Sequence, residues 1–600
     1  MNQDLPAVTG THALAADRRV APDWVEPSAV IGAAVLCYWA IIHAAASIGV
    51  ASIWTHVGAA VVSLAGPTLY VREGIVPFRC RDRSRSVTLL TISVFTLALA
   101  ARVYTISMRP LWDDEGWTLH IVYGGSLGDV IKISIQDFWP PLHYVIVNGV
   151  ARILDTGALN LRLPSVVFGV MTVALLPALG RMLFGRPAIG SLAALLLAGA
   201  VPHVLYSQMA RVYALQVLLG VVCSHYFYKA FVQSRVSAGH VAATSLLLYC
   251  HAYSWYLVAA HWLFIIVAVL LLKMRTQLMP ALKAQGIVLL LYAPLIMSFA
   301  YVRYVQQIQV PVGWANGPDH VTFAAVPLLF ASLSVRSGVG VGCFAMLTVL
   351  VAIVTYRASV RPGVTPGEAR GVGQEALLPF IFVACWVITP AAVSLFASIV
   401  TPMRSFGPVK YHLVMLPGIC LLAAAGLSAI RSRISLVIIF ATVATVAVTD
   451  LQKYYREFDY PHFDDAARFV KSRRQPAERI YLGNGFRVFN YYYNDQYPRM
   501  GSRDWDAFDA QFAGLENIFV DGTQRYGYSH RSEKMYDFIT YLSTAPRQAL
   551  AEGRLSPPFW VVVGEPAERQ LVQTAVDSGA YRIVEAVPFK DVDVFLVARR

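Results

Sequence analysis

The sequence predicts a polytopic α-helical membrane protein that carries a small α/β domain outside the membrane. The 600-residue chain is 56% hydrophobic and only 14% charged, with a mean hydropathy of +0.54. Hydrocarbon accepts such a chain as helices, because their backbone polar groups pair within each segment. From Asp450 onward the composition changes, and short apolar runs replace the long ones.

Charge and cysteine usage exclude several other classes. The net charge of +13 does not indicate a nucleic-acid partner, because much of the excess lies in short loops between apolar segments, as cytoplasmic loops require. The seven cysteines show no CxxC motif or zinc-like spacing and predict neither disulfides nor a structural metal. No cleavable signal precedes Pro27, so we expect the first apolar segment to remain as a span.

Apolar segments long enough to cross a core of roughly 30 Å predict about thirteen spans. They lie at 28–49, 51–71, 87–106, 163–184, 188–206, 212–232, 241–253, 255–272, 286–302, 338–356, 376–400, 411–430 and 434–449. Basic loops mark the cytoplasmic side, which places the N-terminus inside and the C-terminus outside. Residues 142–154 and 321–335 are too short to cross. We expect 142–154 to lie along the membrane interface, in the first outer loop.

These segments define four predicted regions. Residues 1–27 form a cytoplasmic tail, 28–86 an additional transmembrane hairpin with a basic loop, 87–450 the main membrane domain, and 451–600 the outer α/β domain. In the outer domain, helical spacing or strand composition predicts helices at 464–470 and 567–576 and strands at 479–482, 559–563, 581–587 and 592–597.

Three consecutive acids, Asp113-Asp114-Glu115, follow directly after a long apolar segment. Carboxylates where a span leaves the bilayer are costly unless they have a function. The basic loops place them on the non-cytoplasmic side, where a lipid-borne and a water-borne substrate meet. A carboxylate there can take the proton of a hydroxyl or amine that attacks a sugar carbon. The sequence predicts a catalytic base; the alternative is a solvated loop or a helix N-cap.

Basic side chains in other outer loops are candidates for binding a phosphate. Arg211 ends an outer hairpin in 206–213, where its fork matches phosphate oxygens; the alternative is snorkelling to lipid headgroups. Lys410 and Arg404 lie in an outer loop where topology does not predict positive charge. His251 ends another span, and a simple helix-end histidine is the alternative there.

Two further residues are candidates for contacts with an acceptor or a sugar. His143 follows Pro140-Pro141 and binds an acceptor or a phosphate, or serves as a polar anchor. Trp314 stacks on a sugar or marks the interface. The sequence has no Gly-rich phosphate loop, HExxH motif or nucleophile elbow. A nucleotide-sugar or ATP site is therefore unsupported, which fits a lipid phosphate as the leaving group.

At these residues the chain resembles the C-type membrane glycosyltransferases (GT-C). It is most similar to the bacterial branch that includes protein O-mannosyltransferase-like and aminoarabinose-transferase-like enzymes. The motifs are Leu111-Trp-Asp-Asp-Glu115, Pro140-Pro-Leu-His-Tyr144, Arg162-Leu-Pro-Ser165, Gly180-Arg-Met-Leu-Phe-Gly185, Tyr206-Ser-Gln-Met-Ala-Arg-Val-Tyr-Ala-Leu215, and Lys410-Tyr411 before Leu416-Pro417.

The resemblance implies interfacial helices in the first outer loop and transfer of a sugar from a polyprenyl-phosphate donor. The acceptor is a glycolipid, polysaccharide or protein of the cell envelope, on the periplasmic face of a bacterial inner membrane. The family's acidic pair maps onto Asp114 and Glu115, and its arginine onto Arg211. The chain departs from the family at Met209, where similar sequences carry an acid, and at Lys410, where they carry an arginine.

We expect a single inverting displacement. Asp114 takes the acceptor proton, and Glu115 positions the acceptor or helps to bind an ion. Arg211 and Lys410, with Arg404 and His251, stabilise the leaving phosphate. The predicted acceptor- and sugar-binding residues are His143, Tyr206, Gln208, Tyr213, Trp314 and Tyr411.

Cofactor use and several alternative functions stay open at this point. No cofactor is certain, and a divalent metal ion is left open. A ligase or polymerase of lipid-linked oligosaccharides is the main alternative. A secondary transporter is less favoured, because transporters place ionisable groups near the midplane of repeated halves. A non-catalytic envelope assembly protein is a third reading.

Overall fold

The computed structural model describes residues 85–122, 126–305, 325–334, 366–400, 406, 408–428, 433–457, 460–493, 539–542 and 544–600. All of them belong to one compact unit, Arg85–Arg600. Three predicted spans, at 28–49, 51–71 and 338–356, lie outside the described residues, as do the candidate site residues Arg404 and Trp314.

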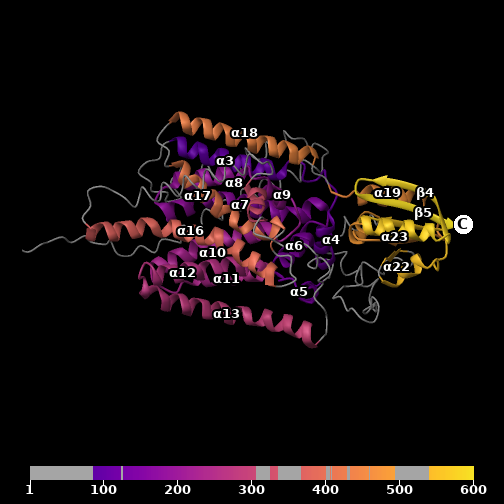
Figure 1. Ribbon diagram of the computed structural model, residues 1–600, viewed down its shortest axis with the longest axis horizontal. Coiled ribbons are helices and arrows are strands. Elements are labelled where there is room, and N and C mark those ends of the chain that lie inside the picture. The colour runs from indigo at the N-terminus through magenta and orange to yellow at the C-terminus, as the bar shows by residue number, and fades with distance from the viewer. Residues whose placement is uncertain are drawn as a thin grey trace, which may run out of the picture. The chain divides into compact units, whose positions relative to one another are not determined.

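Helices dominate the chain up to residue 457 (Figure 1). Apart from α4 to α6, described below, they are α3 (Arg85–Val103), α7 (Ala158–Phe184), α8 (Pro187–Ala198), α9 (Val201–Ser207), α10 (Tyr213–Val232), α11 (Ala238–Cys250), α12 (Trp255–Leu270), α13 (Leu278–Ala300), α14 (Ala325–Ser334), α16 (Pro366–Val400), α17 (Leu416–Ser428) and α18 (Arg433–Glu457). Short turns are η1 (Ala252–Ser254), η2 (Arg275–Gln277), η3 (Tyr301–Val305) and η4 (Val409–Met415).

Within the described residues, six helical segments are long and apolar enough to cross a membrane, and seven if the bent pair α8–α9 counts as one span. This confirms the prediction of a helical protein with several membrane spans. The count of about thirteen remains a prediction, since part of the apolar sequence lies outside the described ranges.

The predicted span at 188–206 is two helices, α8 and α9, which bend by 68° where they meet. Pro202 stands in the first turn of α9, and a proline there removes a backbone donor that would continue the ladder. The buried guanidinium of Arg102 compensates, because its Nη1 donates to the free carbonyl of Ala198 at 3.3 Å. The bend directs the segment after α9, residues 208–211, toward the first outer loop, where Ala210 contacts α4 (Asp113–Val122).

Helices α7 and α8 pack with their backbones in direct contact. A Cβ atom placed on Gly180 would lie 2.4 Å from the Cα of Gly190, and one placed on Gly190 would lie 2.2 Å from the carbonyl oxygen of Leu176. Only glycine allows this approach at both positions. Close packing of small residues is a common way to hold helices together in a membrane.

The first outer loop contains three short helices, α4, α5 (Leu127–Gln136) and α6 (Leu142–Ile153). A capping box starts α5, in which Ser126 and Asp129 each satisfy the other's backbone N–H. The 12 residues of α6 are too few to cross a bilayer. A short helix was predicted there, at 142–154.

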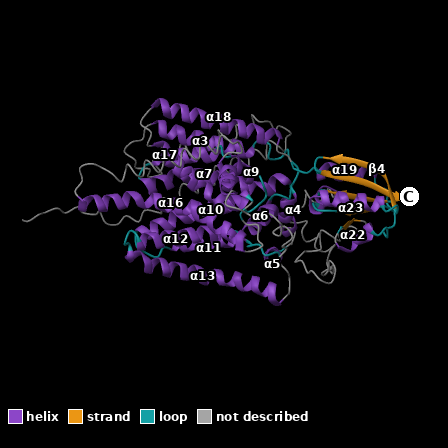
Figure 2. Ribbon diagram, viewed as in Figure 1, coloured by secondary structure: helices purple, strands orange, loops and turns teal. Residues whose placement is uncertain are grey.

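The domain from residue 460 onward, called the outer domain after its predicted location, is a five-stranded sheet with helices on it (Figure 2). Its elements are α19 (Phe463–Arg473), β1 (Arg479–Leu482), α20 (Phe486–Tyr493), β2 (Ile539–Tyr541), α22 (Thr544–Ala551), β3 (Phe559–Val563), α23 (Pro566–Asp577), β4 (Tyr581–Phe589) and β5 (Val592–Arg599). The strand order is β2-β1-β3-β5-β4. Strand β1 runs parallel to β2 and β3, and β5 runs antiparallel to β3 and β4.

The sheet shares its core with the first outer loop. Alternate side chains of β1 and β3 point to opposite faces. Tyr481 and Val561 face one cluster with α22 and α23, whereas Leu482 and Val562 face the other cluster. That second cluster joins α19 and α20 to apolar residues of α4 and α6, such as Leu119. The outer domain and the acidic helix α4 therefore form one packed structure.

Candidate active site

Glu115 lies at the base of the site, fully buried, and both its carboxylate oxygens are occupied. Arg162 donates to it from Nη2 to Oε2 at 2.6 Å and from Nε to Oε1 at 2.8 Å. The backbone N–H of Trp112 donates to Oε2, and that of Ala210 donates to Oε1. Each oxygen thus accepts two hydrogen bonds. The sequence predicts that Glu115 positions the acceptor or helps to bind an ion; in the structure its carboxylate is occupied by Arg162 and two backbone N–H groups.

The segment 208–211 is held in place from several sides. Gln208 donates to the carbonyl of Tyr104 at 2.6 Å and accepts from the hydroxyl of Tyr454 at 2.7 Å. Thr118 donates to the carbonyl of Ala210 at 2.7 Å. The amide of Gln208, predicted to bind the acceptor, is therefore used to fix the backbone that carries Arg211.

Arg211 projects into a buried cluster of polar and aromatic side chains. This residue is 2% exposed, and neither its Nε nor its Nη1 donates a well-aligned hydrogen bond to a described residue. The guanidinium carbon lies 5.1 Å from the ring centre of Trp139 and 5.9 Å from that of Tyr213. A buried cation with free donors is costly unless an anion joins it. This arrangement favours an anionic ligand.

Asp114 and Lys410 form an ion pair beside this cluster. Lys410 Nζ donates to Asp114 Oδ2 at 2.7 Å, and both side chains are about one fifth exposed. Burial alone would raise the pKa of the Asp114 carboxyl, but the charges of Lys410 and Arg211 lower it overall. The described residues thus place a carboxylate and two cations next to one another.

Two neutral imidazoles complete the polar cluster. Burial, reinforced by the charge of Arg211, lowers the pKa of His143 to about 3. The backbone N–H of Tyr253 donates to His251 Nδ1 at 3.0 Å, so the proton of that ring is on Nε2. This Nε2–H, like both ring nitrogens of His143, has no well-aligned partner among the described residues. His251 is therefore a free donor in the cluster.

Aromatic rings form the wall of the cluster. The ring centres of Tyr206 and Tyr213 are 5.1 Å apart, and those of Tyr213 and His251 are 5.8 Å apart. The ring of Tyr411 packs at 4.3 Å from that of Tyr253. Eight predicted site residues from five separate segments come together here. They are Asp114, His143, Tyr206, Arg211, Tyr213, His251, Lys410 and Tyr411.

Sequence reasoning missed four residues of the site. Tyr144 and Asp137 are buried and carry side-chain oxygens without a well-aligned partner, and Trp139 lies against Arg211. Arg162 is the partner of Glu115. All four lie in or next to the quoted motifs, so position in a motif was a signal. Their hydrogen-bonding state depends on the tertiary structure.

Among the described residues, no set of side chains at this site is arranged to hold a metal ion. Asp114 is paired with Lys410, Glu115 is paired with Arg162, and an apolar side chain stands at Met209. In the described part of the chain, one trio of side chains has metal-like spacing, at His462, Asp464 and Asp465. These three lie at the start of α19, and Arg468 bridges both of the aspartates.

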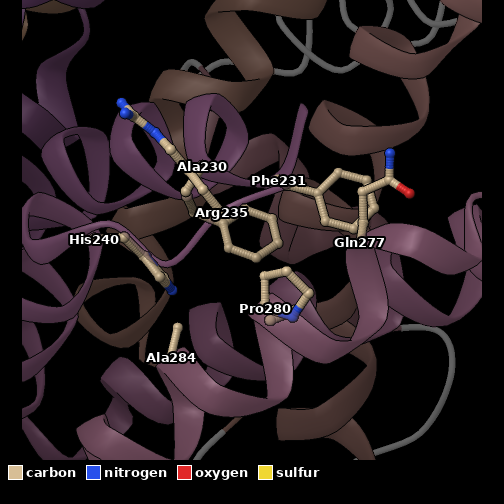
Figure 3. A pocket seen from close by; sticks show the side chains of 9 residues that line it. Ala230, Phe231, Arg235, His240, Gln277, Pro280 and Ala284 are labelled. Carbon is tan, nitrogen blue, oxygen red and sulfur yellow. The ribbon is translucent and has the colours of Figure 1, made fainter. Parts of the chain in front are cut away.

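A small cavity lies between α10, α11 and α13 (Figure 3). Phe231, Arg235, His240 and Gln277 are among its lining residues. None of the candidate site residues lines it.

Known proteins match this chain in fold but not in sequence. No protein-family model matches the chain, and no curated protein matches it significantly. The structure of ArnT from Cupriavidus metallidurans in the apo state superposes with a TM-score of 0.53 at 12% identity, covering 85% of this chain and 98% of that one. The same protein bound to undecaprenyl phosphate gives 0.50 at 12% identity, covering 86% and 98%. An oligosaccharyltransferase from Archaeoglobus fulgidus gives a TM-score of 0.43 at 12% identity, covering 84% and 88%.

These likenesses establish the class of fold. The chain has the fold of the GT-C membrane glycosyltransferases, as its motifs predicted. Within that class, it resembles ArnT over nearly the whole length of that protein.

Proposed function

We propose that the chain is a membrane glycosyltransferase that moves a sugar from a polyprenyl-phosphate donor to an acceptor of the cell envelope. The buried Arg211, with free donors next to the Asp114–Lys410 pair, is the observation that carries this proposal. A lipid phosphate supplies the missing anion, and ArnT of this fold has been seen with undecaprenyl phosphate. The proposed location is a bacterial inner membrane, with the outer domain in the periplasm.

The reaction is a single displacement with inversion. The acceptor oxygen attacks the anomeric carbon while the bond from that carbon to the phosphate oxygen breaks. Asp114 takes the acceptor proton, and the phosphate leaves with the bonding electrons. Arg211, Lys410 and the Nε2–H of His251 stabilise the charge that grows on the phosphate. No step depends on a metal ion.

The ion pair links donor binding to activation of the base. In the free protein, Lys410 holds Asp114 Oδ2 at 2.7 Å and keeps its pKa low. A bound phosphate competes for Lys410 and adds a negative charge nearby. Both changes raise the proton affinity of Asp114. The carboxylate therefore becomes a better base when the donor is in place.

The residues around the reacting groups have separate roles. Glu115 and Gln208 hold the segment that carries Arg211. His143, Tyr206, Tyr213 and Tyr411 surround the donor sugar and exclude water.

A mass-spectrometric comparison of envelope glycans from wild-type and deletion strains tests the function. The mass difference identifies the sugar and the acceptor. Asp114→Asn, returned to the deletion strain, should fail to restore the modified species. Restoration by this variant would remove Asp114 as the base.

Binding of undecaprenyl phosphate to the purified full-length protein tests the phosphate site. Arg211→Gln and Lys410→Gln should each weaken binding by about 10- to 100-fold, since each removes a charge-assisted contact. Asp114→Asn should bind as tightly as wild type or more tightly, because it frees Lys410. Lys132→Gln, at an exposed lysine of α5, is the matched control. Equal affinity in all variants would contradict the phosphate site.

A further inference from the structure

The carboxyl ends of the parallel strands β1 and β3 face the helix that carries the catalytic acids. Strand β1 ends at Leu482, and the turn after it leads into α20 with Arg487 near its start. The guanidinium of Arg487 lies 4.1 Å from the ring centre of Trp117 on α4. A Cβ atom on Gly116 would lie 3.1 Å from Val488. The outer domain therefore contacts α4 one turn away from Asp114. In open α/β sheets, this edge of the sheet is where ligands bind.

Three acidic side chains belong to this part of the fold. Asp113 lies on α4, Asp137 follows α5, and Glu565 follows β3. The charge of Arg487 acts on the carboxyls of both Asp113 and Asp137, and Glu565 acts on Asp113. The four groups, from the first outer loop and the outer domain, thus share one electrostatic environment.

Two of these carboxyl groups have oxygen atoms without partners. Asp137 is 6% exposed, and its Oδ2 has no hydrogen-bond partner among the described residues; the same holds for the buried Oδ1 of Asp113. Burial raises the pKa of Asp113 to about 6 and that of Asp137 to about 8, against the charge of Arg487. Native proteins rarely leave buried polar atoms unpaired. Such atoms are expected where a ligand supplies the partners.

The two sides of the catalytic acids therefore differ in charge. On one side, Arg211 and Lys410 are suited to an anion. On the other, Arg487 acts on Asp113 and Asp137, and the charge of Arg211 also reaches Asp113. The raised pKa of Asp137, about 8, keeps that carboxyl largely protonated at neutral pH. With Asp113 and Glu565 as counter-charges, this second side has no surplus of positive charge to hold a phosphorylated acceptor. Hydroxyl groups both donate and accept, so they match carboxyl groups next to a guanidinium.

We propose that Asp113, Asp137 and Arg487 form an acceptor subsite for a neutral, polyhydroxylated carbohydrate. The inference rests on the proposed function and adds the chemical class of the acceptor. Hydroxyls of the acceptor glycan bond to the two carboxyl groups, and Arg487 donates to a neighbouring sugar oxygen. Asp113 thereby delivers one hydroxyl to Asp114, its neighbour in the chain. The outer domain contributes directly to acceptor choice through Arg487.

Binding measurements on the full-length protein in lipid nanodiscs test the subsite. The probes are three envelope fractions from the deletion strain, in which the acceptor is unmodified: neutral polysaccharide, phosphorylated glycolipid, and Ser/Thr-rich peptides. Undecaprenyl phosphate is the probe for the donor side. We expect the neutral fraction to bind, and the phosphorylated and peptide fractions to bind at least tenfold more weakly.

Variants separate this inference from the proposed function. Asp113→Asn and Arg487→Met should weaken binding of the neutral fraction at least tenfold and leave the affinity for undecaprenyl phosphate within twofold of wild type. Arg487→Lys should recover part of the loss. Arg479→Met, at the exposed opposite end of β1, is the control and should change neither affinity.

The possible failures are distinguishable. Tighter binding of the phosphorylated or peptide fraction would overturn the subsite while the donor site stands. So would unchanged affinity for the neutral fraction in both variants. A variant that has the Tm of wild type but binds neither the neutral fraction nor undecaprenyl phosphate would also overturn it, because the residue would then act on the whole site. If wild type does not bind undecaprenyl phosphate, the proposed function itself fails.

Discussion

Replacing Glu115 by glutamine should destabilise the protein, whereas replacing Asp114 by asparagine should not. The Glu115 carboxylate is fully buried and accepts four hydrogen bonds, two of them from Arg162. Glutamine removes the charge and directs an N–H₂ group at one pair of donors. The guanidinium of Arg162, 1% exposed, then remains buried without its counter-ion.

The expected cost is about 3–5 kcal/mol, the range for breaking one partner of a buried ion pair. Arg162 keeps its bonds to the carbonyls of Ile106, Arg109 and Pro110, which favours the lower half of that range. The Asp114–Lys410 pair is partly exposed, and pairs of that kind contribute about 0–1 kcal/mol. The two conservative substitutions should therefore differ by a few kcal/mol.

Thermal unfolding with a thiol-reactive dye measures this difference in the intact protein. In the described ranges, four free cysteines are buried and become reactive on unfolding: Cys223, Cys250, Cys385 and Cys420. Glu115→Gln should lower Tm by several degrees, and Asp114→Asn should melt within about a degree of wild type. If Glu115→Gln has the same Tm as wild type and yet abolishes transfer, Glu115 acts on the substrate and the positioning role is wrong.

Three other predictions follow from local geometry. Gly190→Ala should lower Tm markedly, because its Cβ would overlap the backbone of α7; Gly149→Ala, with nothing within 4 Å, should be neutral or slightly stabilising. Asp137→Asn should raise Tm at pH 8 and change it little at pH 4. The pKa of Asp137 rises from an ordinary 3.8 to about 8 in the fold. The carboxyl's contribution to stability is therefore complete below pH 4 and is lost as the pH rises through 8. A wild-type Tm that does not fall relative to that of the variant across this range would contradict the shift. Gln208→Leu should weaken undecaprenyl phosphate binding without contacting the phosphate, by releasing the segment before Arg211; unchanged affinity would show that this segment is held by other contacts.

Secondary structure could be predicted where strand-forming residues stand in a short run. Strand β3 is a continuous apolar run, and β1 is one after the exposed Arg479. Their predicted bounds at 479–482 and 559–563 match the structure. The three residues of β2 are too few to give a pattern. The bend between α8 and α9 was missed because both helices are apolar, and its support by Arg102 comes from a distant part of the sequence.

The candidate site shows the same division between local and tertiary information. The basic loops predicted Asp114, Arg211 and Lys410 on the same side of the membrane, and the structure brings these three side chains together. The separate roles of Asp114 and Glu115 could not be read from adjacent acids. They depend on Arg162, 47 positions away from Glu115, and on which carboxylate the fold buries.

The position of β5 makes the sheet depend on residues 592–599. Strand β5 follows β4 in the chain, yet it lies inside the sheet between β3 and β4. During translation, β3 and β4 have no strand between them until β5 has been made. A chain that stops after β4 therefore lacks the strand that joins β4 to the rest of the sheet. A stop codon between β4 and β5 should yield a product whose membrane helices insert while its sheet stays open to proteolysis.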